Sequence, residues 1–157
     1  MKMLVNLDVN DHCRQVGILP SDTILDVVRH QMGLTGTKRG CDMGTCGCCA
    51  VLIDGRPVLG CLTLAADCEG KRIQTIEAIA TDEGLHPVQK AFEECGATQC
   101  GYCTPGFIIA SKVLLEENPT PSREEIAYAL SGNMCRCTGY KKILDAVEKA
   151  AKDIQAA

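Results

Sequence analysis

The sequence contains no tryptophan, and aromatic residues make up 3% of its 157 residues. A site that stacks a flat cofactor between aromatic rings is therefore not expected on this chain. The formal net charge is -4, without the excess of lysine and arginine that nucleic-acid-binding proteins carry. No apolar run approaches the ~20 residues that a membrane-spanning helix needs. These absences favour a globular protein that binds neither nucleic acid nor membrane.

An export signal is also not expected at the start of the chain. Polar residues interrupt the apolar ones there, at Asn6, Asp8 and Asn10, so that no continuous apolar segment forms. We therefore expect the protein to be cytoplasmic.

Cysteine is the abundant residue, with twelve in the chain. Disulfides, zinc and iron–sulfur clusters are the three uses that compete to explain this number. Residues 41–61 contain five of the cysteines, and two of them, Cys48 and Cys49, are adjacent. Bridges are hard to build between such close neighbours, so metal binding is the favoured interpretation.

The order of predicted elements divides the chain into two domains, 1–78 and 79–157. In the first, alternating apolar residues and turn signals predict a small sheet packed on one helix, with elements at 3–9, 13–19, 24–32, 50–53, 57–60 and 72–76. In the second, apolar residues at helical spacing predict four helices, at 86–95, 104–117, 122–132 and 138–154. Thr104 is the predicted N-cap of the second of these helices.

One group of cysteines follows the spacing C-x4-C-x2-C with a distal fourth, which is typical of plant-type [2Fe–2S] ferredoxins. Glycines allow the loop to approach the sulfurs closely and to expose backbone N–H groups to an anionic cluster. The predicted ligands are Cys41, Cys46, Cys49 and Cys61, and the supporting glycines are Gly40, Gly44 and Gly47. Cys48 is left as a packed side chain that does not bind iron.

The hairpin at Asp54-Gly55 bears on the choice between the adjacent cysteines. A two-residue loop would place Cys61 opposite Cys48, whereas a three-residue loop, 54–56, would place it opposite Cys49. The spacing favours Cys49 as the ligand, so we predict the three-residue loop.

A second group consists of the pairs Cys100/Cys103 and Cys135/Cys137, each just before a predicted helix. Free N–H groups at two helix N-termini would suit an anionic cluster there. Zinc remains an alternative for this group, although a C-x-C pair is tighter than the usual zinc spacing.

Three segments resemble the iron–sulfur subunit of the molybdenum hydroxylases, the xanthine dehydrogenase family: TGTKRGCDMGTCGCCAVLIDG, TQCGYCTPGFIIAS and GNMCRCTGYKKI. The resemblance implies an α+β fold, with an N-terminal β-grasp, plant-type ferredoxin-like domain followed by an all-α four-helix domain. Each domain would carry one [2Fe–2S] cluster. Cys48 departs from the family, which more often has alanine at this position.

The resemblance also implies an assembly and a function. A large subunit would hold a molybdenum–pterin cofactor and a medium subunit FAD, in a hetero-oligomer such as a dimer of heterotrimers. Gln99 would hydrogen-bond the pterin, and Cys137 would be the iron ligand nearest to it. The chain would relay electrons between molybdenum and flavin, in a xanthine dehydrogenase-like or 4-hydroxybenzoyl-CoA reductase-like enzyme.

No catalytic residue is expected on the chain itself, because no nucleophile–base pair or phosphate-binding loop has motif support. Two other functions fit part of the pattern. One is a free-standing two-cluster ferredoxin that diffuses between partners, and the other is an interaction module stapled by zinc.

Overall fold

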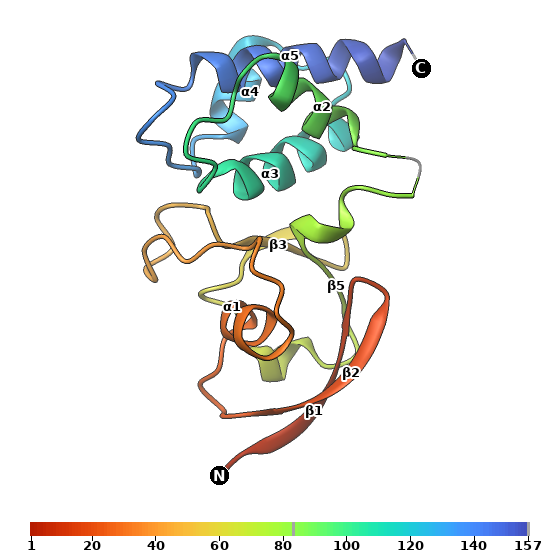
Figure 1. Ribbon diagram of the computed structural model, residues 1–157, viewed down its shortest axis with the longest axis vertical. Helices are drawn as coiled ribbons and strands as arrows, with labels where there is room; N and C mark the ends of the chain where they lie inside the picture. The colour runs from red at the N-terminus through yellow and green to blue at the C-terminus, as the bar shows by residue number, and fades with distance from the viewer. Residues whose placement is uncertain (83, 157) are drawn as a thin grey trace.

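A computed structural model of the chain describes residues 1–82 and 84–156. Figure 1 shows a helical domain stacked on a domain built around a sheet, with the N-terminus and C-terminus at opposite ends of the molecule. The segment that links the domains runs along one side (Figure 1).

The N-terminal domain holds a five-stranded mixed sheet in the order β2-β1-β5-β3-β4. Its strands are β1 (Met3–Val9), β2 (His12–Ile18), β3 (Ala50–Ile53), β4 (Arg56–Leu59) and β5 (Arg72–Gln74). Strand β1 pairs with β2 in the antiparallel and with β5 in the parallel direction. This mixed sheet on one helix agrees with the predicted ferredoxin-like fold.

The alternation of apolar residues that predicts the first strand matches the burial of its side chains in the structure. Val5, Leu7 and Val9 are buried, and they point to the same face of β1. The turn that follows has Asn10 and Asp11 at φ values of 55° and 62°. Two successive left-handed residues form the turn that matches the twist of a two-residue hairpin.

A short helix covers this sheet and leads into the first cysteine-rich loop. Helix α1 (Ile24–Asp26) continues directly as a π-helical turn, η1 (Val27–Gln31). It begins with a capping box, in which the Thr23 hydroxyl accepts from the Asp26 N–H and the Asp26 carboxylate accepts from the Thr23 N–H. The capping box therefore fixes the residue at which α1 begins after β2.

Strand β3 contributes to two cores. Val51 and Ile53 belong to the core of the sheet domain, while Ala50 and Leu52 belong to a second core shared with the helices. Alternate residues of a strand point to opposite faces, so an apolar run of four is buried on both sides. The two domains therefore pack against each other across this strand.

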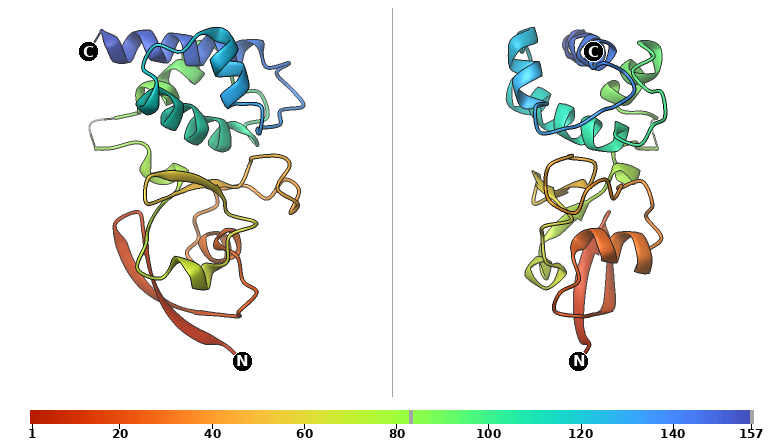
Figure 2. Two further views of the ribbon diagram at one scale, coloured as in Figure 1. Left: turned by 180° about the vertical axis from the view of Figure 1, so that it is seen from behind. Right: turned by 90° about the vertical axis from the view of Figure 1, so that its left-hand side faces the viewer.

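The C-terminal domain contains four helices, arranged as Figure 2 shows from two further directions. They are α2 (Pro87–Glu94), α3 (Thr104–Glu117), α4 (Arg123–Ala129) and α5 (Lys141–Gln155). The sheet domain, for its part, has two short 3-10 turns on either side of β5: η2 (Ala65–Cys68) and η3 (Ile76–Ala78). The predicted number of helices is confirmed.

Several helix boundaries differ from the predictions. Thr104 is the first residue of α3 and Cys103 is its N-cap, so the prediction of Thr104 as N-cap is wrong. Helix α4 begins with a capping box formed by Ser122 and Glu125, but it ends at Ala129 rather than at the predicted residue 132. Helix α5 begins at Lys141, because Tyr140 takes a left-handed conformation.

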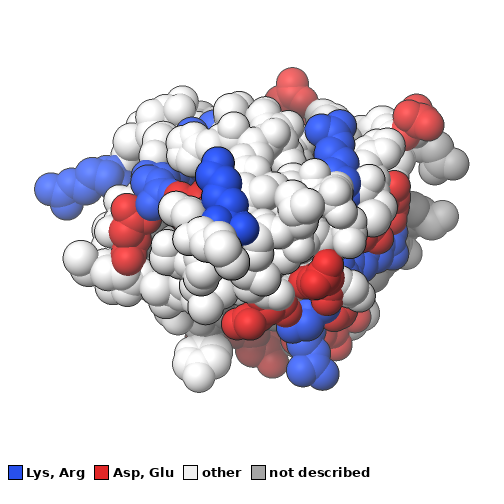
Figure 3. All heavy atoms as spheres, turned by 90° about the horizontal axis from the view of Figure 1, so that it is seen from below, with Lys and Arg blue, Asp and Glu red and all other residues white. Residues whose placement is uncertain are grey.

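Charged side chains of both signs are interspersed on the face of the sheet domain seen in Figure 3, with uncharged surface between them. In the part of the chain that the structure describes, no helix is both long enough and apolar enough to cross a bilayer.

The start of α2 yields a pH-dependent prediction. The Nδ1 atom of His86 accepts a hydrogen bond from the Val88 N–H at 3.2 Å, which requires a neutral imidazole. Burial lowers the pKa of His86, nearby Lys112 lowers it further, and Glu116 opposes both. The folded state therefore takes up this proton at lower pH than the unfolded state does, and the stabilisation is complete above about pH 6.5.

As the pH falls below that value, this contribution to the free energy of unfolding is lost. We expect amide hydrogen exchange in residues 88–94, corrected for intrinsic rates, to be faster at about pH 5.5 than at about pH 7.5. His86→Asn keeps a side-chain cap and should remove most of this difference, whereas His30→Asn, at an exposed position, should not. Equal pH dependence in wild type and His86→Asn would show that the cap does not titrate.

Candidate metal centres

The first group of cysteines lies in the loop that runs from η1 to β3, together with Cys61 after β4. The thiols come together in pairs. Cys41 lies close to Cys46, and Cys49 lies close to Cys61. Cys46 also lies close to Cys49 and to Cys48, so the whole group is compact.

The hairpin between β3 and β4 corrects one prediction. Ile53 pairs with Arg56, so the loop is the two-residue turn Asp54-Gly55, and the predicted three-residue loop is wrong. Cys61 still reaches Cys49, because β4 ends at Leu59 and the chain turns before Cys61. The register of the ladder therefore does not decide which cysteine faces Cys61.

Burial and hydrogen bonding affect these thiols in opposite ways. The backbone N–H of Met43 points at the Cys41 sulfur at 3.5 Å and, with Thr45 and Cys46, lowers the pKa of Cys41 to about 6. Burial raises the pKa of Cys49 to about 12. A buried thiol of this kind becomes a thiolate at neutral pH when a metal ion supplies the compensating charge.

The loop passes so close to the sulfurs that a side chain at Gly40 would not fit. A Cβ atom at this position would lie 2.7 Å from the Cys46 sulfur and 3.3 Å from the Cys48 sulfur. Gly44 and Gly47 have φ values of 77° and 68°, which glycine adopts without strain. The three predicted glycines thus shape the loop around the cysteines.

The second group of cysteines lies at one end of the helical domain and also forms two pairs. The sulfurs of Cys100 and Cys137 are 3.5 Å apart, and the thiol of Cys103 lies close to that of Cys135. Cys100 and Cys137 are exposed, whereas Cys103 and Cys135 are buried. The group therefore has an outer pair and an inner pair.

Hydrogen bonds to sulfur in this group come from a loop more than from the start of α5. Both the N–H and the hydroxyl of Thr138 donate to the Cys135 sulfur, at 3.5 Å and 3.1 Å. Burial raises the pKa of Cys135, but these donors outweigh it and the pKa is lowered. Burial raises the pKa of Cys103 to about 12. Helix α3 begins beside Cys103 as predicted, but α5 begins four residues after Cys137.

All twelve cysteines are free thiols. Among residues 1–82 and 84–156, no three side chains of the metal-binding types gather around a single point. The predicted ligands instead form two adjoining pairs in each group. Two irons that each take two cysteine sulfurs match this donor set, and thiolate sulfur is the ligand that iron–sulfur clusters use. The residues therefore fit a [2Fe–2S] cluster at each site.

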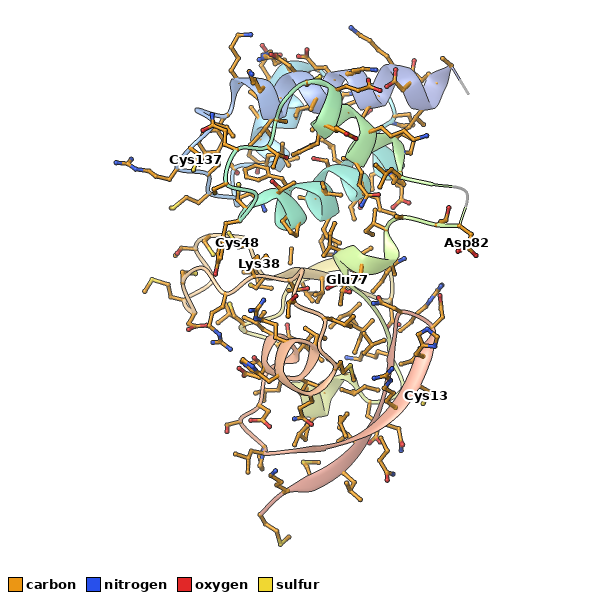
Figure 4. All side chains as sticks on the ribbon, viewed as in Figure 1. Cys13, Lys38, Cys48, Glu77, Asp82 and Cys137 are labelled. Atoms are coloured by element: carbon orange, nitrogen blue, oxygen red, sulfur yellow. The ribbon has the colours of Figure 1, made fainter. Side chains whose placement is uncertain are left out.

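The second group of cysteines meets the cysteine loop of the sheet domain at the boundary between the domains. A hollow of about 250 Å³, which we call the inter-cluster hollow, is lined by cysteines of both groups: Cys46, Cys48, Cys100, Cys103, Cys135 and Cys137. Figure 4 shows Cys48 at the side of the sheet domain that meets the helices, and Cys137 at the same edge of the molecule.

Direct contacts join the two cysteine-bearing loops. The N–H of Met134, next to Cys135, donates to the carbonyl oxygen of Cys46 at 2.9 Å. The side-chain amide of Asn133 donates to the carbonyl of Gly47 at 3.4 Å, and the Tyr102 hydroxyl donates to the carbonyl of Arg39. Sequence analysis did not single out Asn133 or Met134, because their role depends on a contact between distant segments.

Gln99 is exposed, and it directly precedes Cys100, which belongs to the outer pair of the second group. Its predicted role toward a partner's cofactor thus falls on a surface position. The same edge of the helical domain exposes Tyr102 and Met134.

Comparison with known proteins identifies both halves of the chain. A family model described as a 2Fe-2S iron-sulfur cluster binding domain matches residues 9–75, and one described as a [2Fe-2S] binding domain matches residues 75–148. The nicotinate dehydrogenase small FeS subunit of Eubacterium barkeri is 46% identical over 151 residues, which cover 96% of each chain. The chain belongs to the iron–sulfur subunits of the molybdenum hydroxylase family. The family model that matches residues 75–148 also supports a [2Fe–2S] cluster, rather than the alternative of zinc, at the site in the helical domain.

Solved structures agree with this assignment. The iron–sulfur subunit superposes on quinoline 2-oxidoreductase from Pseudomonas putida 86 with a TM-score of 0.93 and 41% identity, covering 99% of this chain and 98% of that one. It also matches the aldehyde oxidoreductase of Desulfovibrio desulfuricans, with a TM-score of 0.91 and 42% identity over 98% of this chain and 17% of that longer one. These relatives are subunits or segments of oxidoreductases, which supports an electron-transfer subunit over a free ferredoxin.

Proposed function

We propose that this iron–sulfur subunit binds one cluster in each cysteine group and passes single electrons between them. A bound [2Fe–2S] cluster supplies a centre that accepts and releases one electron. The proposed ligands are Cys41, Cys46, Cys49 and Cys61 in the sheet domain, and Cys100, Cys103, Cys135 and Cys137 in the helical domain. The pairing of the thiols within each group supports this ligand set. The domain boundary is proposed at residues 78–79, between η3 and α2.

One observation gives the main support for electron transfer between the two clusters. It is the hydrogen bond from the Met134 N–H to the Cys46 carbonyl oxygen, at 2.9 Å. Cys46 is a proposed ligand of one cluster, and Met134 directly precedes Cys135, a proposed ligand of the other. A few covalent bonds and one hydrogen bond therefore connect the two ligand sets. Electrons tunnel more efficiently along such a route than across an equal width of empty space.

The outer edge of the helical domain is the proposed contact with the large molybdenum–pterin subunit. Cys100, Cys137 and Gln99 are exposed there, so a pterin in the partner can approach the outer pair of cysteines. Gln99 would hydrogen-bond the pterin through its amide, and Cys137 would be the ligand nearest to it. Exposed Tyr102 and Met134 at this edge are of the residue types that protein interfaces favour.

The cysteine loop of the sheet domain is the proposed contact with a medium subunit that carries FAD. Met43 and Leu62 are 69% and 59% exposed there, beside the first group of cysteines. Apolar side chains left in water next to an electron carrier are suited to a partner surface. We propose a hetero-oligomer of three kinds of subunit, assembled as a dimer of heterotrimers. The cytoplasm, which keeps thiols reduced, would suit its twelve cysteines, none of which forms a disulfide in the part of the chain that the structure describes.

The substrate is proposed from the names of the relatives. Two of them act on rings that contain nitrogen, nicotinate and quinoline, so N-heteroaromatic compounds are the first candidates. A xanthine dehydrogenase-like or a 4-hydroxybenzoyl-CoA reductase-like reaction would use the same relay, since the direction of electron flow follows from the potentials of the partners.

The complex from the native source provides the test. We expect molybdenum to co-purify with the chain, about four irons per chain, and two distinct [2Fe–2S] signals in electron paramagnetic resonance (EPR) spectra. Adding nicotinate, quinoline, xanthine or an aldehyde anaerobically should, for the true substrate of an oxidative enzyme, reduce both clusters, so that the EPR signals of both reduced clusters appear. An intact preparation with iron but without molybdenum would favour a free ferredoxin and contradict the proposal.

A further inference from the structure

Cys48 is a buried cysteine beside the proposed iron ligands, and it has no role in the proposed ligand sets. Its side chain is 5% exposed and belongs to the core that the sheet domain shares with the helices. It lines the inter-cluster hollow together with five proposed iron ligands. A thiol at this point is next to proposed ligands of both clusters.

The contacts of Cys48 connect it to the relay. Its S–H donates to the carbonyl oxygen of Cys46 at 3.7 Å, and the same oxygen accepts the Met134 N–H. Its thiol also lies close to the Cys46 thiol, and it lines the same hollow as Cys103 of the helical domain. Cys48 thus touches the peptide group through which the two ligand sets are joined.

We propose that Cys48 is a positioning residue for electron transfer, whose S–H orients the Cys46 peptide and sets the relative potentials of the two clusters. This inference rests on the proposed ligand sets. The S–H dipole partly offsets the negative charge of the Cys46 carbonyl oxygen beside the sheet-domain cluster. Removing the donor leaves that oxygen more negative, which disfavours an added electron on this cluster.

The test is a redox titration of the purified complex, followed by EPR, for wild type and two variants at this position. In Cys48→Ala we expect both cluster signals to persist and the potential of the sheet-domain cluster to fall relative to the other. A weak hydrogen bond changes an equilibrium constant by about threefold. The electron should therefore shift about threefold toward the helical-domain cluster, or about 30 mV at 59 mV per tenfold change.

Cys48→Ser retains a hydroxyl donor, so the separation of the two potentials should stay close to that of wild type. Cys68→Ala is the matched control. Cys68 is also a buried thiol that donates to a backbone carbonyl, that of Leu64 at 3.4 Å, but it lies in the other core. Its replacement should lower stability and leave both potentials unchanged.

The possible results separate the inference from the proposed function. If both signals remain and the two potentials keep their separation in Cys48→Ala, the inference is wrong and the relay stands. If Cys48→Ala loses the sheet-domain cluster, Cys48 is itself an iron ligand, and the proposed ligand set is wrong as well. A threefold shift that Cys48→Ser does not restore would assign the effect to the volume of the sulfur and contradict the role of the donor.

Discussion

Replacing Cys137 by serine is expected to leave the protein with one [2Fe–2S] cluster in place of two. Cys137 pairs with Cys100 at a sulfur–sulfur distance of 3.5 Å in the outer half of the second group. A serine hydroxyl is a harder and far less acidic ligand than a thiol, so it binds iron poorly at neutral pH. The iron content should fall from about four to about two atoms per chain.

The first group of cysteines lies in the other domain and keeps all of its proposed ligands in this variant. Its EPR signal should therefore persist in Cys137→Ser, while the signal of the helical-domain cluster is lost. The persisting signal also shows that the sheet domain has folded, so that loss of one cluster is distinguished from global unfolding.

Cys13→Ser serves as the control, because Cys13 is an exposed thiol on β2, away from the domain boundary (Figure 4). This variant should retain both signals. Full iron content in Cys137→Ser, or loss of the sheet-domain signal instead, would contradict the proposed assignment of ligands to the two clusters.

A single methyl group at Gly106 should disturb the junction between the domains. Gly106 lies in the first turns of α3, and a Cβ atom there would be 2.3 Å from the carbonyl oxygen of Gly47 and 3.1 Å from the Asn133 amide nitrogen. The clashing atom of Gly47 belongs to the backbone and cannot move away by a change of side-chain rotamer. Helix α3 and the cysteine loop must therefore move apart. This movement lengthens the nearby hydrogen bond between Met134 and Cys46.

Two opposing effects set the size of the change in Gly106→Ala. Alanine in place of glycine within a helix stabilises by about 0.5–1 kcal/mol. Overpacking a buried contact costs about 1–3 kcal/mol, and backbone on the opposing side places this site toward the upper end. We expect a net loss of about 1–2 kcal/mol in the free energy of unfolding, measured by denaturant titration. Magnetic coupling between the two reduced clusters should weaken as they move apart.

Gly132→Ala is the matched control for this variant. Gly132 is in the same region, has ordinary backbone angles, and has no atom within 4 Å of an added Cβ. It should therefore keep wild-type stability and wild-type magnetic coupling. Wild-type behaviour of Gly106→Ala on both measurements would show that the domains are not in the tight contact described.

The cluster sites were predictable from sequence to the extent that ligand spacing is a local property. C-x4-C-x2-C and the two later pairs identified the cysteines that the structure brings together. The hairpin prediction failed because it extended a strand ladder to Cys61, although β4 ends before that residue. A motif specifies which atoms meet, but not the path of the chain between them.

The junction between the domains has one signal in the sequence. The run Ala50–Ile53 is apolar at every position, which is typical of a strand covered on both faces. Gly106 and Asn133 gave no such signal. Their importance comes from the approach of the Gly47 loop, a contact between segments far apart in the sequence.

The two-sided burial of β3 has a consequence for how an enzyme containing this subunit can be controlled. Both halves pack against one short strand, β3, which holds the described parts of the two domains together as one body. The span between the electron carriers is then a fixed length, built in when the chain folds. Any conformational regulation of electron flow is expected to act at the outer surfaces, where the neighbouring subunits attach and detach.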